Sequence, residues 1–256
     1  MNSNQCLRSV SIYLSILVSF TSIYSQPNLK DYCRVTSELG FFLYLQYGYD
    51  MELRNHQSYA EPNKFDRKCR DIFKWNNNIQ EASNISDYFL YGFFLGSIPF
   101  SPFISNDNYN ELILNNIEIL AINGIITNLV KFTIKRQRPY SYYQTKNNNK
   151  DSYKSFFSGH TSTAFAIGTS TAMTLSNNTD YNDTIIWATI LSAATATGYF
   201  RIASDKHYMS DVLTGAIVGS FIGQHLYKIQ TNRKKRKKNY QLTYYNKKFF
   251  ITFNLQ

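Results

Sequence analysis

Residues 200–211 contain an Arg, a His and an Asp in the pattern Arg-x5-His-x3-Asp, at Arg201, His207 and Asp211. The apolar run 212–227 predicts a helix whose first turns carry His207 and Asp211 on one face, because side chains four residues apart are neighbours on a helix. A carboxylate there can fix the tautomer of the imidazole and leave the other ring nitrogen free as a nucleophile or base. Arg201 adds a permanent planar cation that suits an oxyanion such as phosphate. The alternative is an ordinary helix start with incidental polar residues.

A second pair of cations lies at the end of a long helix candidate, 111–136. Lys131 and Arg138 are separated by six residues, and Pro139 follows. At roughly 100° per residue the two side chains have nearly the same azimuth, provided that the helix continues that far. Asn and Glu residues interrupt the apolar stripe of this segment, which suits a helix in a protein core better than one in lipid.

A third stretch, Ser158-Gly159-His160, precedes the small-residue helix candidate 161–175. It offers a hydroxyl, a flexible backbone whose N–H groups can approach an anion, the positive end of a helix, and an imidazole. The tripeptide alone would carry no argument. Its value lies in occurring together with the other two stretches.

The remaining segments predict the frame that positions these residues. We expect a short amphipathic helix at 65–75, with Phe65, Cys69, Ile72 and Phe73 near one face. Ser86-Asp87 is typical of a helix start, before the uncharged run 88–105 with its two prolines, and 184–200 predicts a helix that leads to Arg201. Alternating apolar residues in 240–256 predict two short strands around Asn246-Lys247-Lys248.

The composition indicates one folded domain. The chain has 256 residues, of which 43% are hydrophobic and 16% aromatic, and this argues against disorder. We find no sustained repeat, no Gly-rich phosphate loop and no cluster of zinc ligands in the sequence.

The N-terminal 25 residues differ from the rest of the chain. Arg8 is their only charge, 10–24 is largely apolar, and Ser25-Gln26-Pro27 suits a cleavage site. This resembles a secretory signal peptide, with an uncleaved anchor as the alternative. Removal of residues 1–25 takes away Arg8 and no acid, so the formal charge falls from +10 to +9.

Six consecutive cations, 233–238, contribute much of that positive charge and favour an anionic surface. For an exported protein we expect anionic lipid or lipopolysaccharide rather than nucleic acid. Cys33 and Cys69 would remain after cleavage. They either form a disulfide in an oxidising compartment or are two buried thiols that never meet.

Together, in this order, the three stretches resemble the type 2 phosphatidic acid phosphatase superfamily, which also contains bacterial acid phosphatases and vanadium haloperoxidases. Its motifs are Lys-x6-Arg-Pro, Pro-Ser-Gly-His and Ser-Arg-x5-His-x3-Asp, and the resemblance covers roughly residues 85–229. Two positions depart from the pattern. Phe157 replaces the family's Pro, which puts the rigidity of that loop in doubt, and Phe200 replaces its Ser.

The resemblance implies the roles of the catalytic residues. His207 would be the nucleophile that accepts the phosphoryl group, and Asp211 would orient it. His160 would protonate the departing oxygen and then help water to attack the phosphohistidine. The other two histidines, His56 and His225, lie outside the motifs and are interpreted as structural or surface residues.

The resemblance also implies the phosphate ligands, namely Lys131, Arg138, Arg201, Ser158 and the N–H of Gly159. No metal and no cofactor is required in this scheme. Phosphoryl transfer depends on positioning and on stabilising oxygens whose charge shifts in the transition state, which agrees with three cations converging on one site.

The expected fold is an all-α helical bundle with a short C-terminal β-hairpin. We divide the chain into a signal peptide (1–25), an N-terminal helical and loop segment that packs on the core (26–84), a phosphatase core (85–230), and the basic run with the hairpin (231–256).

The family has both soluble secreted and six-pass membrane members. The uncharged runs 88–105, 161–176 and 184–200 come close to the length that spans a bilayer. With the site facing outward, however, the loops 106–112 and 177–183 would be cytoplasmic, and neither contains Lys or Arg. Only the run 233–238 would fit the positive-inside rule. Together with a mean hydropathy of −0.35, this favours a soluble exported domain, periplasmic or in the cell envelope, that touches membrane through its basic tail and aromatic face.

The expected function is that of a metal-independent phosphatase acting on a phosphate monoester or diphosphate, with a lipid or lipid-like leaving group. The first alternative is a haloperoxidase that holds vanadate in the same anion site. The second is a non-catalytic envelope protein that only binds anions. An oriented pair of imidazoles argues against the second, because gripping an anion needs only cations and N–H donors.

Overall fold

The computed structural model describes residues 27–48, 61–105, 109–146, 149, 151–245 and 248–253, with side chains as far as residue 234. The predicted signal peptide (1–25) and His56 lie outside the described residues. The elements are the helices α2 (Leu29–Leu43), α3 (Lys64–Phe73), α4 (Ile79–Leu95), α5 (Ser101–Ile104), α6 (Tyr109–Ile134), α7 (Pro139–Tyr142), α8 (Gly159–Asn178), α9 (Asp183–Ala203) and α10 (Met209–Asn239), the π-helical turns η1 (Tyr44–Gly48) and η3 (Gly96–Phe100), and the strands β1 (Tyr240–Tyr245) and β2 (Lys248–Phe253).

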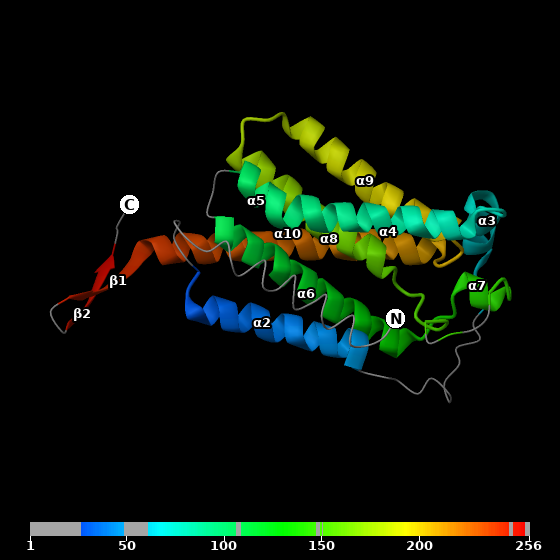
Figure 1. Ribbon diagram of the computed structural model, residues 1–256, viewed down its shortest axis with the longest axis horizontal. Coiled ribbons are helices and arrows are strands. Elements are labelled where there is room, and N and C mark those ends of the chain that lie inside the picture. Colours follow the sequence, from blue (N-terminus) through cyan, green and yellow to red (C-terminus); the bar gives the residue numbers. More distant parts are fainter. Residues whose placement is uncertain are drawn as a thin grey trace.

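The predicted all-α bundle is confirmed. Helix α10 runs along the bundle, with α8, α6 and α9 packed against it, α4 packed on α9 and α8, and α2 packed on α6 (Figure 1). Helices α3 and α7 lie at one end of the bundle, and the C-terminal hairpin projects from the other (Figure 1). Ile119, Ile167, Ile222 and Leu226 form the centre of the core, where α6, α8 and α10 meet.

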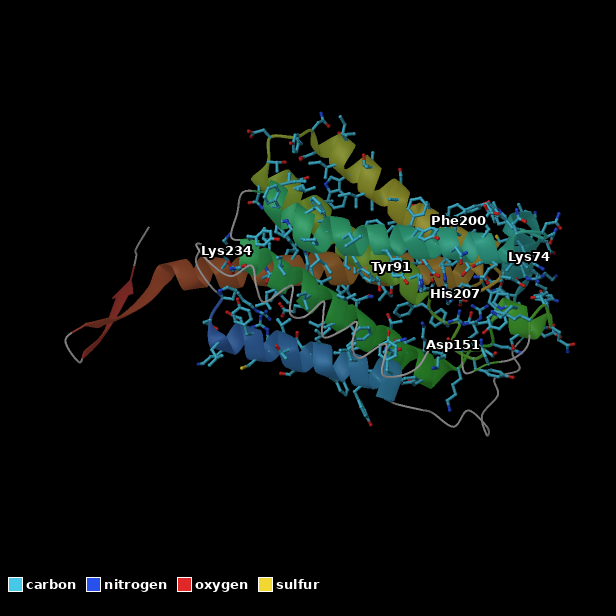
Figure 2. The ribbon with its side chains drawn as sticks, in the orientation of Figure 1. Lys74, Tyr91, Asp151, Phe200, His207 and Lys234 are labelled. Atoms are coloured by element: carbon cyan, nitrogen blue, oxygen red, sulfur yellow. The ribbon has the colours of Figure 1, made fainter. Side chains whose placement is uncertain are left out.

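The predicted C-terminal hairpin is present. Strands β1 and β2 pair antiparallel, with Tyr240 opposite Phe253 and Tyr245 opposite Lys248. Lys74, Asp151 and His207 are found at one end of the bundle and Lys234 at the other (Figure 2). The basic run therefore begins at the end of the bundle remote from His207.

Helices α8 and α10 pack backbone to backbone. A Cβ atom added at Gly219 would lie 2.2 Å from the carbonyl oxygen of Ser162, and one at Gly223 would lie 2.2 Å from that of Ala166. Any side chain at these positions would therefore push the helices apart. This close contact fixes the start of α8, which carries His160, relative to the start of α10, which follows His207.

Several helix boundaries differ from the sequence-based expectations. Helix α4 begins at Ile79, so Ser86 and Asp87 lie within it rather than at its start, and the expected division between residues 84 and 85 falls inside this helix. Helix α6 ends at Ile134, where Lys135 takes a φ of 49°, so Lys131 and Arg138 do not share one helix. Helix α10 begins at Met209, which leaves His207 in the preceding loop.

Helix α3 buries only part of its predicted apolar face, in which Cys69 is buried at 9% exposure. Phe65 and Ile72 are exposed, at 53% and 62%, whereas Asp66 and Arg70 are buried, at 0% and 8%. Burial of charged residues is costly unless they are paired, so the partners of Asp66 and Arg70 explain the orientation of the helix. Arg70 donates to both carboxylate oxygens of Asp205, at 2.6 and 2.9 Å, in the loop before α10.

Two further sequence features have a structural outcome. Cys33 and Cys69 are free, so the disulfide alternative is not realised, and Cys33 is exposed rather than buried. Phe200, which replaces the family's Ser, stacks on Phe89 and lies edge-on to Trp75, at ring-centroid distances of 6.0 and 5.6 Å. It therefore fills the junction between α4, α9 and the segment after α3.

The contact between α8 and α10 can be tested with one methyl group. Gly223→Ala is expected to destabilise the protein by about 1–3 kcal/mol, the usual cost of overpacking, and to lower Tm in a thermal unfolding experiment. Gly40→Ala on α2 is the matched control, because its added Cβ meets nothing within 4 Å. Equal Tm values for the two variants would contradict the proposed backbone contact.

Candidate active site

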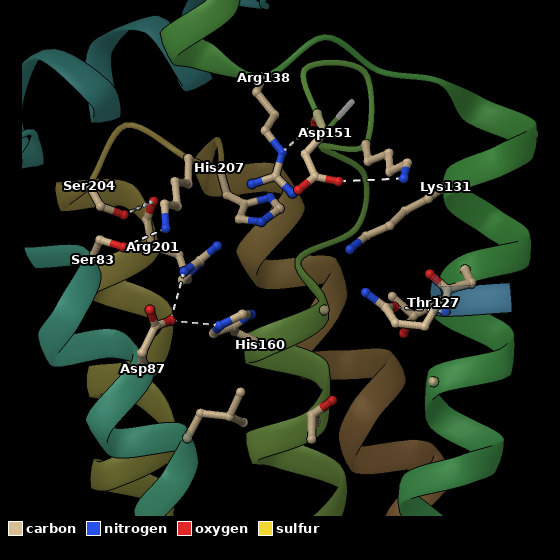
Figure 3. A pocket seen from close by; sticks show the side chains of 18 of the residues that line it. Ser83, Asp87, Thr127, Lys131, Arg138, Asp151, His160, Arg201, Ser204 and His207 are labelled. Carbon is tan, nitrogen blue, oxygen red and sulfur yellow. Dashed lines mark hydrogen bonds and ion pairs between the residues drawn. The ribbon is translucent and has the colours of Figure 1, made fainter. Parts of the chain in front are cut away.

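A cavity of about 980 Å³ opens at the end of the bundle where α3 and α7 lie. Six of the eight residues predicted to form a site line it: Lys131, Arg138, Gly159, His160, Arg201 and His207. Figure 3 shows Lys131, Arg138, Arg201 and His207 around one space, although they come from the end of α6, the loop before α7, the end of α9 and the loop before α10. The fold therefore brings the three sequence motifs together.

The cations of the cavity are arranged to hold an anion. Arg138 and Arg201 are 8% and 3% exposed, and buried guanidinium groups require a partner. The Nε of Arg138 donates to the backbone oxygen of Asp151 at 2.8 Å, whereas the Nε of Arg201 has no hydrogen-bond partner among the described residues. A Cβ at Gly159 would lie 3.1 Å from Lys131 Nζ, so the glycine leaves room for this ammonium group.

His207 is held in the loop between α9 and α10. Its backbone N–H donates to the carbonyl oxygen of Arg201 at 3.2 Å, and the residue is 2% exposed. Burial, with Arg138, Arg201 and Lys131 nearby, lowers the pKa of His207 well below its ordinary value. The imidazole is therefore neutral near pH 7, which is the form in which a ring nitrogen can act as a nucleophile.

Asp211 faces His207 from the first turn of α10. The distance from His207 Nδ1 to Asp211 Oδ2 is 3.7 Å, which is longer than a hydrogen bond, and Nδ1 has no other partner among the described residues. Catalytic hydrogen bonds are often long before a ligand binds and shorten in the complex. The two side chains are close enough for an ion pair, and the predicted orienting role of Asp211 stays a prediction.

His160 has a carboxylate partner that the sequence analysis missed. Its Nε2 lies 2.8 Å from Asp87 Oδ1, and the same oxygen lies 3.4 Å from Arg201 Nη1 (Figure 3). Asp87 lies on α4 together with one other acid, Glu81, and is separated from His160 by 73 positions, so no local spacing links the two. The only sequence signal was an acid in a helix that carries no other charge after Glu81.

Further charges line the rim of the cavity. Burial, with Arg201 nearby, lowers the pKa of Lys206 to about 8, and its ammonium group donates to Ser83. Burial tends to raise the pKa of Asp151, but the neighbouring Arg138, Lys154 and Lys131 outweigh this and lower it. Asp151 thus remains ionised and partly compensates the cations.

Ser158 lies behind the cavity rather than in its lining. Its hydroxyl oxygen caps α8, accepting from the N–H of Thr161 at 3.4 Å and from the Thr161 hydroxyl at 2.9 Å. The backbone N–H of Ser158 donates to the carbonyl oxygen of Asp211 at 3.1 Å. In this arrangement Ser158 fixes the helix start that presents His160, and its predicted contact with phosphate stays a prediction.

The cavity becomes apolar away from the cations. Large apolar side chains of α2, η1, α4 and α6 line that part of it: Phe42, Tyr47, Leu90, Tyr91, Phe94 and Leu120. The site therefore joins an anion-binding end to an apolar end. Within the part of the chain that the structure describes, no three His, Cys, Asp or Glu side chains are grouped so that they could hold a metal ion.

Comparison with known proteins finds a matching family model and a curated relative, each over part of the chain. A family model described as the PAP2 superfamily matches residues 113–235. Among curated proteins, the lipid A 1-phosphatase of Porphyromonas gingivalis is 29% identical over 119 residues, which are 46% of this chain and only 23% of that protein.

Two solved structures are similar. One is a transmembrane PAP2-type phosphatidylglycerolphosphate phosphatase from Bacillus subtilis, with a TM-score of 0.53 and 17% identity over 81% of this chain and 98% of that chain. At this identity the likeness shows the fold. The other is Aquifex aeolicus LpxE, with a TM-score of 0.40 and 23% identity over 61% of this chain and 98% of that chain.

Proposed function

We propose that this chain, whose residues 113–235 match the PAP2 superfamily model, is a phosphatase that removes phosphate from a lipid or lipid-like monoester or diphosphate. The observation that carries this proposal is the two-sided cavity. Lys131, Arg138 and Arg201 at one end suit a phosphoryl group, and the apolar end suits a hydrocarbon leaving group. A cavity of about 980 Å³ accommodates far more than phosphate alone.

In the proposed mechanism His207 attacks phosphorus and the bond to the leaving oxygen breaks, giving a phosphohistidine. The three cations hold the equatorial oxygens, and the buried setting strengthens these interactions relative to water. Asp211 stabilises the positive charge that forms on the imidazole, because its Oδ2 faces Nδ1. The fixed cations supply the charge stabilisation in this scheme, and no metal or other cofactor takes part.

His160 serves both half-reactions. It gives a proton to the leaving oxygen in the first, and in the second it takes a proton from the water that attacks the phosphohistidine. Asp87 engages Nε2 of His160, which leaves Nδ1 to exchange the proton. Asp87 also lies beside Arg201, so one carboxylate couples the general acid to the phosphate ligand.

The central test is hydrolysis by the purified protein. We expect release of phosphate from at least one lipid phosphate in a set containing phosphatidate, an isoprenyl diphosphate and phosphorylated lipid A, with inhibition by vanadate. His207→Ala is expected to abolish turnover on every substrate, since no later step can occur without the covalent intermediate. EDTA is expected to have no effect.

His225→Ala is the matched control for His207→Ala, because His225 lies on α10 and stacks on Phe221 away from the cavity. Activity that disappears with EDTA and returns with a divalent metal would disprove the mechanism. Oxidation of bromide by peroxide with added vanadate would favour the haloperoxidase alternative.

The pairing of Asp87 with His160 predicts a dependence on the leaving group. Asp87→Asn and His160→Ala are both expected to lower kcat/KM for an alkyl phosphate by roughly 10²-fold or more, and for p-nitrophenyl phosphate by much less, because a phenolate departs without a proton. The quantity kcat/KM reports formation of the intermediate. Glu81→Gln removes the same charge from the same helix and is expected to leave both values unchanged. Equal losses on the two substrates would show that these roles are misassigned.

We infer further that the bundle is embedded in a membrane. Large apolar side chains are exposed along α4, α5 and α10, among them Tyr88 at 68%, Phe103 at 73% and Ile217 at 70%. Helices α6 and α9 are long and apolar enough to cross a bilayer. Soluble monomers rarely expose so much apolar surface, so the structure favours the membrane alternative over the soluble domain that the loop charges favoured.

The orientation follows from the position of the basic run. Residues 233–238 lie at the end of α10, remote from the cavity, and clusters of Lys and Arg remain on the cytoplasmic side. The catalytic end would therefore face outward, to the periplasm or the external surface. This agrees with the export expected from the N-terminal 25 residues.

Cysteine labelling tests this orientation. In a variant without native cysteines, Asp71→Cys on α3 is expected to react with a membrane-impermeant maleimide in spheroplasts, and Asp180→Cys between α8 and α9 only after lysis. Both positions are exposed, so they differ only in the end of the bundle at which they lie. Labelling of both residues in intact spheroplasts would contradict a membrane-spanning bundle, and the reverse pattern would invert the orientation.

A further inference from the structure

Arg136 lies between two buried carboxylates at the back of the site. Its Nη1 is 2.6 Å from Asp211 Oδ1, and its Nη2 is 2.6 Å from Asp66 Oδ2. Both carboxylates are fully buried, at 0% exposure. The turn at Lys135, with its φ of 49°, directs the chain out of α6 immediately before Arg136. Neither Arg136 nor Asp66 belongs to the motifs by which the site was identified.

Asp66 connects this pair to the first turn of α10. Its Oδ1 accepts from the backbone N–H of Ser210 at 2.8 Å, and its Oδ2 accepts from the Ser210 hydroxyl at 2.7 Å. The same hydroxyl oxygen accepts from Arg136 Nη1 at 2.8 Å. Asp66, Arg136, Ser210 and Asp211 therefore form one closed network that joins α3, the end of α6 and the start of α10.

The network determines which oxygen of Asp211 faces His207. Oδ2 accepts from the Ser155 hydroxyl at 2.6 Å and from the N–H of Tyr208 at 3.0 Å, and it is the oxygen 3.7 Å from His207 Nδ1. Oδ1 is taken by Arg136. With both oxygens assigned to separate donors, the carboxylate cannot rotate without losing a charge-assisted hydrogen bond.

Arg136 also sets the charge of Asp211. A buried carboxylate without a cation is costly and tends to take up a proton, whereas a guanidinium stays charged. The groups that face Asp211 are Arg136 from the end of α6, Ser155, Tyr208 and His207, and Asp66 of α3 acts on it through Arg136. Arg136 is the guanidinium that contacts Asp211, so its removal would leave this buried carboxylate without its close cationic partner.

We propose that Arg136 and Asp66 are positioning residues of the reaction, which together orient the Asp211 carboxylate and keep it ionised so that it can hold His207. This inference rests on the proposed phosphatase function. It assigns a catalytic contribution to α3, a helix that lies outside the matched residues 113–235. Neither residue lines the cavity, so neither touches the substrate.

The test compares Arg136→Ala, Arg136→Lys and Asp66→Asn on one substrate. Arg136→Ala is expected to lower kcat by roughly 10²-fold, the scale of a small misplacement of a reacting group, with KM changed by less than about threefold because Lys131, Arg138 and Arg201 are intact. Arg136→Lys is expected to recover part of kcat, since an ammonium group keeps the charge but cannot span two carboxylates as a guanidinium does.

The pH profile distinguishes positioning from a merely structural role. In Arg136→Ala the acidic limb of the kcat/KM profile is expected to move to higher pH, because Asp211 takes up a proton more readily when its cation is gone. Arg136→Lys should return the acidic limb of the kcat/KM profile toward its wild-type pH. Asp66→Asn is nearly isosteric and provides a second variant if Arg136→Ala fails to fold. The double variant that combines Arg136→Ala with Asp66→Asn should show no lower kcat than Arg136→Ala alone if the two residues act as one unit.

Arg67→Ala is the matched control, since Arg67 lies next to Asp66 on α3 with a side chain that is 45% exposed. The inference is wrong if Arg136→Ala and Asp66→Asn keep the kcat of the wild type, or if kcat falls only in proportion to Tm with an unchanged pH profile. Failure of the proposed function is a separate result: the wild type would release no phosphate, or His207→Ala would stay active.

Discussion

Repulsion among buried cations is the constraint on which the rest of this structure depends. Lys131, Arg138 and Arg201 converge on one cavity, and two of them are less than a tenth exposed. Like charges that are buried together in a medium of low dielectric constant repel one another and oppose folding. They are tolerated only where carboxylates or a bound anion compensate them. Burial lowers the pKa of His207 and of Lys206, and the neighbouring cations lower it further.

The compensating acids come from separate parts of the chain. Asp87 of α4 lies beside Arg201, and Asp151 of the loop before α8 lies near Arg138. One donor in the cavity is still unsatisfied, since the Nε of Arg201 has no hydrogen-bond partner among the described residues. A phosphoryl group would complete the balance. The positive charge of the cavity would therefore favour binding of the negatively charged substrate that we propose.

The positions of these charged residues along the chain explain which features could be predicted from the sequence alone. The helices 111–136, 161–175 and 184–200 were predicted because apolar or small-residue runs are local signals, and the motif residues were found because their spacing is local too. Asp87, Asp66 and Arg136 were missed because their partners are distant in the chain. Asp66 and Ser210, for example, are 144 positions apart.

The same reasoning accounts for the errors. For α3, apolar periodicity predicted that Phe65 and Ile72 would be buried, but the need to pair Asp66 and Arg70 determined which face turned inward. For His207, a run of apolar residues cannot show on which side of the helix start a residue lies. Asp211 accepts the N–H of Tyr208, and the helix begins at the next residue.

The position of the site at the end of the bundle suits the proposed lipid phosphate substrate, whose phosphate needs a polar, hydrated environment and whose chain needs a hydrocarbon environment. The cations need contact with water or an anion, and Asp87 and Asp151 need contact with water or a cation, whereas Leu90, Tyr91 and Phe94 are suited to hydrocarbon. Along α4 the change occurs within one turn, between Asp87 and Leu90. A substrate with a phosphate head and a hydrocarbon chain has its own polarity boundary at the bond that is broken, and the cavity places His160 at that boundary. In the proposed arrangement the helix ends of the bundle serve two purposes, because they supply fixed N–H groups and loops for the phosphate and lie where a bilayer meets water.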